Sequence, residues 1–219
     1  CEDGTRSDPN FIIKCFQLAI KYGAKTINIA DTVGYSTPTE MYKLIKKVSN
    51  SVKGFEKCNL SVHCHNDLGM ATSNTLQAVV AGANQVECTI NGIGERAGNA
   101  PLEEVVMAIE TRKDFYKKNT NINTGLLKKS SDIVSKLSSF TVSKNKPIVG
   151  ENAFAHESGI HQHGVINKRE TYEIMDPKKI GHKTQINIGA QSGLKGIKYK
   201  LKNYNLDYKK IDLKKFVKY

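Results

Sequence analysis

The first half of the chain alternates short unbroken apolar runs with longer stretches in which apolar residues recur at steps of three and four. Short runs of this kind predict buried strands, and steps of three and four predict helices with one apolar face. The predicted strands are Lys25–Ala30, Leu60–His65 and Gln85–Ile90. The predicted helices are Phe11–Tyr22, a segment that opens at Pro38, Thr72–Ala81 and Pro101–Thr111. Such alternation is typical of an α/β protein with a parallel sheet and crossover helices.

The pattern changes near Thr111. A helix-like stretch covers Leu126–Leu137, and a strand-like run, KTQINIG, follows Gly181. We therefore predict a domain boundary near residue 112, with residues 1–112 in the α/β domain and residues 113–219 in a mostly helical subdomain.

Polar residues stand at the end of each predicted strand. They are Asp31 and Thr32 after the first, HCHND (residues 63–67) through the end of the second, and NGIGER (residues 91–96) after the third. In parallel α/β folds the carboxyl ends of the strands meet on one face, and reactive residues gather there. The sequence therefore predicts one functional site built from these three segments.

The two histidines at positions 63 and 65 are the sharpest chemical feature. On a strand, residues i and i+2 point to the same face, so His63 and His65 are placed to share one ion, while Cys64 points the other way. The alternative is that both histidines make ordinary hydrogen bonds. Their place at the end of a buried strand, followed by Asn66 and Asp67, favours a metal site. Such nitrogen and oxygen donors suit Mn, Mg, Zn or Co.

The segment GIGERAGN (residues 92–99) is a glycine-rich turn that also carries an acid, a base and an amide. Its glycines allow backbone amides to approach a ligand closely, which favours a place in the site. The alternative is a plain turn between a strand and a helix. In that case Asn99 caps the following helix, and Glu95 is only the ion-pair partner of Arg96.

The net charge of +12 lies in the second half of the chain. Residues 1–110 hold 10 Lys+Arg against 12 Asp+Glu, and residues 111–219 hold 23 against 9. A basic half permits a nucleic-acid-binding hypothesis, which predicts affinity that falls steeply with salt. Base readout and stacking favour Arg and aromatic residues, whereas the chain has 29 Lys, 4 Arg and no Trp. We therefore expect a solvated lysine-rich face, which also steers anionic cofactors, and no nucleic-acid partner.

The cysteines and the absence of long apolar runs bear on the compartment. Five cysteines without any C-x-x-C pair indicate neither a disulfide framework nor a structural zinc cluster. The chain shows no run of about 18 apolar residues and no basic-then-apolar leader, so we expect no membrane partner. The expectation is a cytoplasmic protein, with a plastid-type organelle as the alternative in a eukaryote.

Three segments resemble the signature segments of the 2-isopropylmalate synthase family: VHCHNDLGMA (residues 62–71), VECTINGIGERAGNAPLEEVVMAI (86–109) and AFAHESGIHQHGVINKRETYEIM (153–175). The resemblance implies the last three strand-helix units of a TIM (β/α)8 barrel, followed by a mostly helical subdomain. The implied reaction is the Claisen condensation of acetyl-CoA with 2-oxoisovalerate to 2-isopropylmalate, in leucine biosynthesis. The run GERAGNAPLEE favours this branch, and homocitrate, citramalate and methylthioalkylmalate synthases are the alternatives.

The resemblance also implies how the site binds its ligands. A divalent metal, with Mn or Mg ahead of Zn, is held by His63 and His65, and Asn99 is its oxygen ligand or a near neighbour. Thr32 matches a position that binds the substrate carboxylate. Glu2 matches an acid that contacts the substrate.

Catalytic roles follow from the same resemblance. His161 matches the general base that takes a proton from the acetyl methyl group, and it is joined by Tyr172 from the partner subunit of a homodimer. Glu95 matches an acid that positions reactants or water. Without the resemblance, His161 is a surface helix histidine and Tyr172 a packing aromatic residue.

Two departures from the family bear on completeness. The family's opening strand, with an Arg-Asp motif that supplies a carboxylate metal ligand, does not occur in the sequence, and neither does the leucine-binding regulatory domain. We therefore expect a fragment that is incomplete as an enzyme, or a non-catalytic remnant that associates with a complete subunit. The second departure is His163, which stands where many members have Asp.

Overall fold

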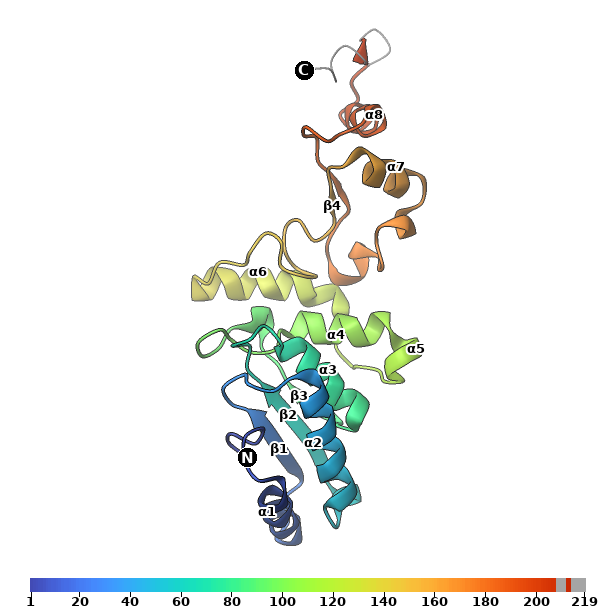
Figure 1. Cartoon of the computed structure of the whole chain (residues 1–219). Helices are drawn as coiled ribbons and strands as arrows, with labels where there is room; N and C mark the ends of the chain where they lie inside the picture. Colours follow the sequence, from blue (N-terminus) through green and yellow to red (C-terminus); the bar gives the residue numbers. More distant parts are fainter. Residues whose placement is uncertain (208–211, 214–219) are drawn as a thin grey trace. The chain divides into compact units, whose positions relative to one another are not determined.

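The computed structural model describes residues 1–207 and 212–213 of the chain (Figure 1). They form two compact units, each described by itself. The first unit comprises residues 1–122 and 134–140, and the second comprises residues 123–133 and the described residues from 141 onward. No helix in the described part is long and apolar enough to cross a membrane.

The first unit contains a parallel three-stranded sheet in the order β1-β2-β3, with a helix after each strand (Figure 1). Its strands are β1 (Thr26–Asp31), β2 (Asn59–Cys64) and β3 (Gln85–Glu87). Its helices are α1 (Pro9–Lys21), α2 (Pro38–Ser51), α3 (Ala71–Ala81), α4 (Leu102–Thr111) and α5 (Lys113–Tyr116), with short 3-10 turns η1 (Phe55–Lys57) and η2 (Ile90–Gly92). The predicted alternation of strands and helices is therefore confirmed.

Two helix starts show how the local sequence sets these boundaries. α1 begins at Pro9, two residues before the predicted start, because the Asp8 side chain accepts a hydrogen bond from the Asn10 amide and proline suits the first helical position. α2 begins at Pro38 as predicted. Thr37 and Glu40 form a reciprocal capping box there, which satisfies backbone N–H groups that the helix leaves unpaired.

The third strand is shorter than predicted. It ends at Glu87 instead of Ile90, because Thr89 turns to meet the chain before α4: its amide donates to Ala100 O at 3.1 Å and its hydroxyl donates to Ile93 O at 2.7 Å. Asn91 follows with a left-handed backbone (φ 62°). The chain thus folds back over the end of the sheet.

The two faces of β2 differ in character. Leu60, Val62 and Cys64 are fully buried in an apolar core that also contains β1 and helix residues such as Met41 and Ile45. Burial raises the pKa of the Cys64 thiol to about 12, so Cys64 is a core residue and not a reactive one. The intervening residues of β2 point to the opposite face, which holds the candidate site.

The second unit is mostly helical. It contains η3 (Thr124–Leu126), the part of α6 (Leu127–Ser138) up to Ile133, α7 (Gly159–Asn167), η4 (Arg169–Thr171), η5 (Pro177–Ile180) and α8 (Leu194–Asn203). β4 (Ala155–His156) and β5 (Gln185–Ile186) form a short parallel pair.

A buried glutamine anchors α7 within this unit. The Gln162 amide donates to His156 O at 3.3 Å, Asn187 O at 2.7 Å and Ser192 Oγ at 3.1 Å. A Cβ at Gly196 would lie 1.8 Å from Gln162 Oε1, so α8 approaches the glutamine through a glycine. This arrangement fixes the rotation of α7, the helix that carries His161.

Candidate functional site

His63 and His65 lie at the carboxyl end of β2 on the face opposite Cys64. Their ring centroids are 4.8 Å apart. The His65 amide donates to Asp31 O at 3.2 Å, which ties the end of β2 to the end of β1. The two-residue repeat of a strand therefore brings both imidazoles to one place, as the sequence predicted.

Asn99 completes this group from the chain segment before α4. It forms an isolated antiparallel bridge with His65, and its side-chain Oδ1 lies 2.9 Å from His63 Nε2. The Asn99 Nδ2 donates to Ile93 O at 3.1 Å, so this contact holds the amide oxygen toward His63. Pro101, not Asn99, is the N-cap residue of α4, so the alternative of a helix cap is wrong.

Both ring nitrogens of His63 face acceptor oxygens. Nδ1 lies 2.8 Å from Glu87 Oε2, and Nε2 lies 2.9 Å from Asn99 Oδ1. A neutral imidazole carries one N–H, so with Nδ1–H donated to Glu87 the lone pair of Nε2 points at an oxygen lone pair. Two species satisfy the contact at Nε2: a ring with hydrogen on Nε2, which donates to Asn99 Oδ1, or a ring with a cation at Nε2.

The second species fits the rest of the site. The Nδ1 atom of His65 is buried and has no hydrogen-bond partner, which is costly unless a ligand binds there. In an octahedral site with bonds of about 2.1 Å, adjacent ligand atoms lie about 3.0 Å apart. The 2.9 Å between His63 Nε2 and Asn99 Oδ1 is close to that value. His63, His65 and Asn99 are therefore suited to hold a divalent ion.

Carboxylates do not contribute to this donor set. In the part of the chain that the structure describes, no group of three or more His, Cys, Asp or Glu side chains is placed to hold an ion. The candidate set is two imidazoles and one amide.

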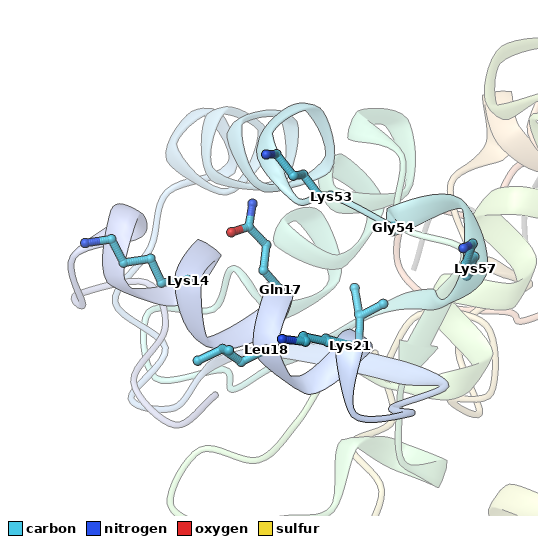
Figure 2. Close-up of a pocket in the computed structure, with 8 residues that line it drawn as sticks. Lys14, Gln17, Leu18, Lys21, Lys53, Gly54 and Lys57 are labelled. Atoms are coloured by element: carbon cyan, nitrogen blue, oxygen red, sulfur yellow. The ribbon is translucent and has the colours of Figure 1, made fainter.

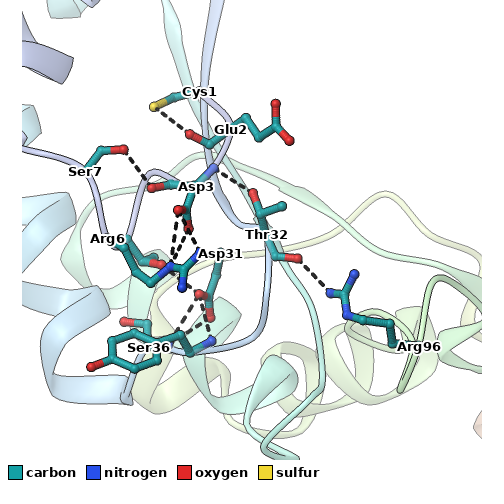
Figure 3. Close-up of polar contacts among 11 residues, drawn as sticks. Cys1, Glu2, Asp3, Arg6, Ser7, Asp31, Thr32, Ser36 and Arg96 are labelled. Carbon is teal, nitrogen blue, oxygen red and sulfur yellow. Dashed lines mark hydrogen bonds and ion pairs between the residues drawn. The ribbon is translucent and has the colours of Figure 1, made fainter.

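Thr32 lies beside the residues at the start of the chain (Figure 3). Cys1 pairs along β1 in a parallel pattern, with Cys1 N donating to Asn28 O at 2.9 Å and Ala30 N donating to Cys1 O at 3.2 Å. Asp3 N donates to Thr32 Oγ1 at 2.7 Å, so a backbone amide fixes the position of the Thr32 hydroxyl. These contacts bring residues 1–3 to the carboxyl end of β1.

Glu2 is exposed next to Thr32. Its backbone oxygen accepts a 3.7 Å contact from Cys1 Sγ, and no hydrogen bond or ion pair of its carboxylate occurs among the described residues. The carboxylate is therefore accessible to a ligand, but the structure adds nothing specific to the role that the sequence predicts for it.

Arg96 ties two strand ends together. Its guanidinium donates to Asp67 Oδ1 at 2.7 Å, Asp67 Oδ2 at 3.1 Å and Thr32 O at 2.7 Å. The hydrogen bond from Arg96 lowers the pKa of Asp67. Arg96 has a left-handed backbone (φ 54°), which is uncommon outside glycine and often marks a functional turn. The partner of Arg96 is Asp67, so the alternative that Glu95 serves as that partner is wrong.

Glu95 is exposed, and its backbone oxygen accepts a hydrogen bond from Gly98 N at 2.8 Å, whereas its carboxylate forms no hydrogen bond or ion pair among the described residues. It lies in the same turn as Asn99, next to Arg96. Its free carboxylate is available to a reactant or to water, which leaves its predicted role a prediction.

Sequence reasoning treated Asp31 only as a polar strand end. The structure buries it completely, and its carboxylate accepts hydrogen bonds from Thr5 Oγ1 at 2.8 Å, Tyr35 N at 3.1 Å, Ser36 N at 3.3 Å and Asn74 Nδ2 at 3.3 Å. Asp31 thus holds the loop that carries Thr32 (Figure 3). The sequence contained the signal for this burial. The two-residue period of a strand puts Asp31 on the face of β1 that packs into the core.

Glu87 was also missed. It lies opposite His63 in the parallel register of β2 and β3, which places both side chains on one face. That register depends on strand pairing over more than twenty residues of sequence, so the local pattern did not reveal it.

His161 and Tyr172 lie together in the second unit. Their rings stack, with centroids 4.1 Å apart and planes at 27°. A Cβ at Gly164, one turn after His161 on α7, would lie 2.5 Å from Tyr172 Cε2, so glycine makes room for the tyrosine ring. Both side chains are exposed, and His163 faces solvent on the same helix.

A buried contact between His156 and Glu173 holds the segment next to Tyr172. His156 Nε2 lies 3.1 Å from Glu173 Oε1, and Thr184 Oγ1 donates to Glu173 Oε2 at 3.0 Å. The contacts of Glu173 therefore limit where the preceding tyrosine can lie.

A cavity of about 710 Å³ lies between α1 and the segment that joins α2 to β2 (Figure 2). It is lined by Lys14, Gln17, Leu18, Ile20, Lys21, Lys53, Gly54 and Lys57. These residues precede the amino ends of β1 and β2, whereas ligands of parallel sheets bind at the carboxyl ends. The cavity is therefore separate from the candidate site.

Comparison with known proteins places these elements in a family. The model of the HMGL-like family matches residues 1–134, which is more than half of the chain. The chain belongs to the HMGL-like family. Residues 148–219 match a second model, described as homocitrate synthase post-HMGL domain-like.

The curated relatives of this HMGL-like chain include 2-isopropylmalate synthases. It is 51% identical to that of Pyrococcus furiosus over 96% of this chain and 43% of the relative, and 52% identical to that of Aquifex aeolicus over 97% and 41%. The enzyme of Rhodopirellula baltica is 55% identical over 88% of this chain and 37% of the relative. The chain thus spans less than half the length of these relatives.

Solved structures show the same fold for the HMGL-like part. The HMG-CoA lyase of Bacillus subtilis has a TM-score of 0.54 at 18% identity, covering 64% of this chain and 47% of that one. The hydroxymethylglutaryl-CoA lyase of Pseudomonas aeruginosa has a TM-score of 0.53 at 19% identity, covering 62% and 45%. The predicted α/β class and the partial barrel are confirmed.

Proposed function

We propose that this chain belongs to a 2-isopropylmalate synthase and supplies its two metal-binding histidines. The reaction condenses acetyl-CoA with 2-oxoisovalerate, consumes one water and releases 2-isopropylmalate and CoA. The observation that carries the proposal is the arrangement of His63, His65 and Asn99, in which His63 Nε2 lies 2.9 Å from Asn99 Oδ1 and the buried Nδ1 of His65 has no hydrogen-bond partner. Identities of 51–55% to 2-isopropylmalate synthases support this substrate pair over those of the homocitrate, citramalate and methylthioalkylmalate enzymes.

The ion that we propose at this site is divalent, Mn or Mg with Zn as the third choice. When bound, it supplies Lewis acidity that polarises the keto carbonyl of the oxo acid. The residues of the chain hold and orient it: Asn99 is kept in place by Ile93 O, and His63 by Glu87.

The oxo acid is bound at the neighbouring strand end. Thr32 contacts its carboxylate through the hydroxyl that Asp3 N already orients, and Glu2 contacts the substrate from the adjacent segment. Glu95 positions the reactants or the water that cleaves the thioester. These roles are assigned because the side chains lie at the carboxyl ends of the strands, where parallel folds build their sites.

His161 is the proposed general base. It takes a proton from the acetyl methyl group, and the carbanion attacks the C2 carbonyl carbon of the oxo acid. The new C–C bond forms as the C=O π bond opens to an alkoxide, which takes up a proton to become the hydroxyl of the product. Tyr172 orients the imidazole, and the ring stack of 4.1 Å supports this pairing. Because the two rings stack within one chain, Tyr172 need not reach His161 from a partner, and we propose that the pair of one subunit acts at the site of the other in a homodimer.

The remaining proposals concern context. We place the domain boundary near residue 112. We place the protein in the cytoplasm, because five free cysteines suit a reducing compartment. We propose that it binds neither nucleic acid nor membranes, since 29 Lys with only 4 Arg and no Trp is a poor composition for reading and stacking bases.

The test is a thiol-release assay on the full-length protein that contains this chain. Acetyl-CoA is offered with 2-oxoisovalerate and, in parallel, with 2-oxoglutarate, pyruvate and a methylthio-substituted 2-oxo acid. We expect the highest kcat/KM with 2-oxoisovalerate and loss of activity in His63→Ala at unchanged thermal stability of the metal-free protein. Release of CoA with another oxo acid, but not with 2-oxoisovalerate, would replace the proposed substrate.

A further inference from the structure

The Glu87 carboxylate on β3 is held by side chains from the other two strands, β1 and β2. Its Oε1 accepts from Asn28 Nδ2 of β1 at 2.7 Å and from Ser61 Oγ of β2 at 3.3 Å. Its Oε2 lies 2.8 Å from His63 Nδ1. Two donors on one oxygen therefore orient the carboxylate so that the other oxygen faces the imidazole.

Glu87 lies on the wrong side of His63 to be a ligand. The two nitrogens of an imidazole point in diverging directions, so an ion at Nε2, beside Asn99, is on the far side of the ring from Glu87. A carboxylate in this place acts through the histidine. It selects the tautomer with hydrogen on Nδ1 and limits rotation of the ring.

We propose that Glu87 is a positioning residue that keeps the Nε2 lone pair of His63 available for a divalent ion. This inference rests on the proposed function only where that function places an ion on His63. Asn28 has a supporting part, because it holds Glu87 from the neighbouring strand. Asn99 is held in the same way, because the hydrogen bond from its Nδ2 to Ile93 O keeps its Oδ1 directed toward His63 Nε2.

A substitution of Glu87 by Gln separates this role from simple packing. The glutamine has the same shape, but its NH2 group can donate to Nδ1 and so move the ring hydrogen to Nε2, where it blocks the ion. A matched control is Glu56→Gln. Glu56 is an exposed acid in η1 at the opposite end of the strands.

The experiment measures Mn²⁺ affinity of the metal-free, full-length protein by the EPR signal of free Mn²⁺, without substrates. The expected loss for Glu87→Gln is about 10- to 100-fold, the range for residues that orient a metal-binding histidine. Asn28→Ala should lose less, and Glu56→Gln should match wild type. Excess Mn²⁺ should restore the kcat of Glu87→Gln, because the ligands themselves are intact.

The outcomes distinguish this inference from the proposed function. Wild-type Mn²⁺ affinity in Glu87→Gln, together with a loss in His63→Ala, overturns the role of Glu87 and leaves the metal site in place. Affinity that is unchanged in His63→Ala overturns both. If Glu87→Gln does not fold, wild-type affinity in Asn28→Ala overturns the inference.

Discussion

At the scale of single residues, the site depends on which atoms are left without a partner. His65 Nδ1 is buried and unpaired, and Nε2 of His63 faces an oxygen once Glu87 takes the other nitrogen. The sequence predicted that the two histidines share a face, because that follows from the two-residue period of a strand. It did not predict Glu87, because the facing residue on a neighbouring strand depends on register, a non-local property.

Glycine 164 offers a residue-scale test of the His161–Tyr172 stack. In Gly164→Ala the new methyl group would lie 2.5 Å from the Tyr172 ring, so the ring must move away from His161. We expect kcat of the full-length enzyme to fall by about 100-fold, the cost of small misplacements of catalytic groups. Helix propensity favours Ala over Gly by about 1 kcal/mol, so unfolding of α7 does not explain such a loss.

The measurement is steady-state kinetics with a thermal melt of each variant. Tyr172→Phe is the control, because it keeps the stacked ring and removes only the hydroxyl. It therefore separates the effect of moving the ring from the effect of losing the hydroxyl. Full kcat in Gly164→Ala would show that the stack has no part in catalysis.

At the scale of elements, the carboxyl ends of the strands are joined by side chains as well as by the sheet. Arg96 contacts Asp67 after β2 and the backbone of Thr32 after β1. Gly34 packs directly against Asp67, and a Cβ at position 34 would lie only 2.6 Å from Asp67 N. The strand and helix order was predictable from periodicity. The early end of β3 was not, because Thr89 leaves the sheet to pair with residue 100, a tertiary contact.

Arg96→Lys tests this connection. Lysine cannot make the two-pronged contact with Asp67 and reach Thr32 O at the same time, so we expect Thr32 to be held less firmly. KM for the oxo acid should rise by about tenfold with a smaller change in kcat, as expected when binding and not chemistry is lost. An unchanged KM would show that Arg96 does not position Thr32. Arg112→Lys, at an exposed ion pair after α4, is the control.

The pH range of this connection follows from the Asp67 pKa. Because the hydrogen bond from Arg96 lowers that pKa below 3.8 in the folded protein, the stabilising contribution is present above this ordinary value and is lost as pH falls through the lower one. The tie between the strand ends therefore persists throughout the neutral and mildly acidic range.

At the scale of the whole molecule, the chain offers an ion three uncharged donors. Two carboxylates next to these donors along the sheet and the chain are engaged elsewhere: Asp67 is bound by Arg96, and Glu87 contacts the other ring nitrogen of His63. Hard divalent ions such as Mn²⁺ and Mg²⁺ bind tightly where carboxylates offset their dehydration. The chain by itself therefore has the geometry for an ion without the charge to hold it firmly.

This leads to a prediction for the 219-residue chain expressed alone. Its Mn²⁺ affinity should be weaker than that of the full-length protein by about two orders of magnitude or more, because affinity follows the number of charged ligands. Titration calorimetry of both proteins, with His65→Ala in each, measures the difference. Zn²⁺ should bind the chain more tightly than Mn²⁺ does, since imidazole donors suit it better. Tight stoichiometric Mn²⁺ binding by the chain alone would mean that a further ligand lies within these 219 residues.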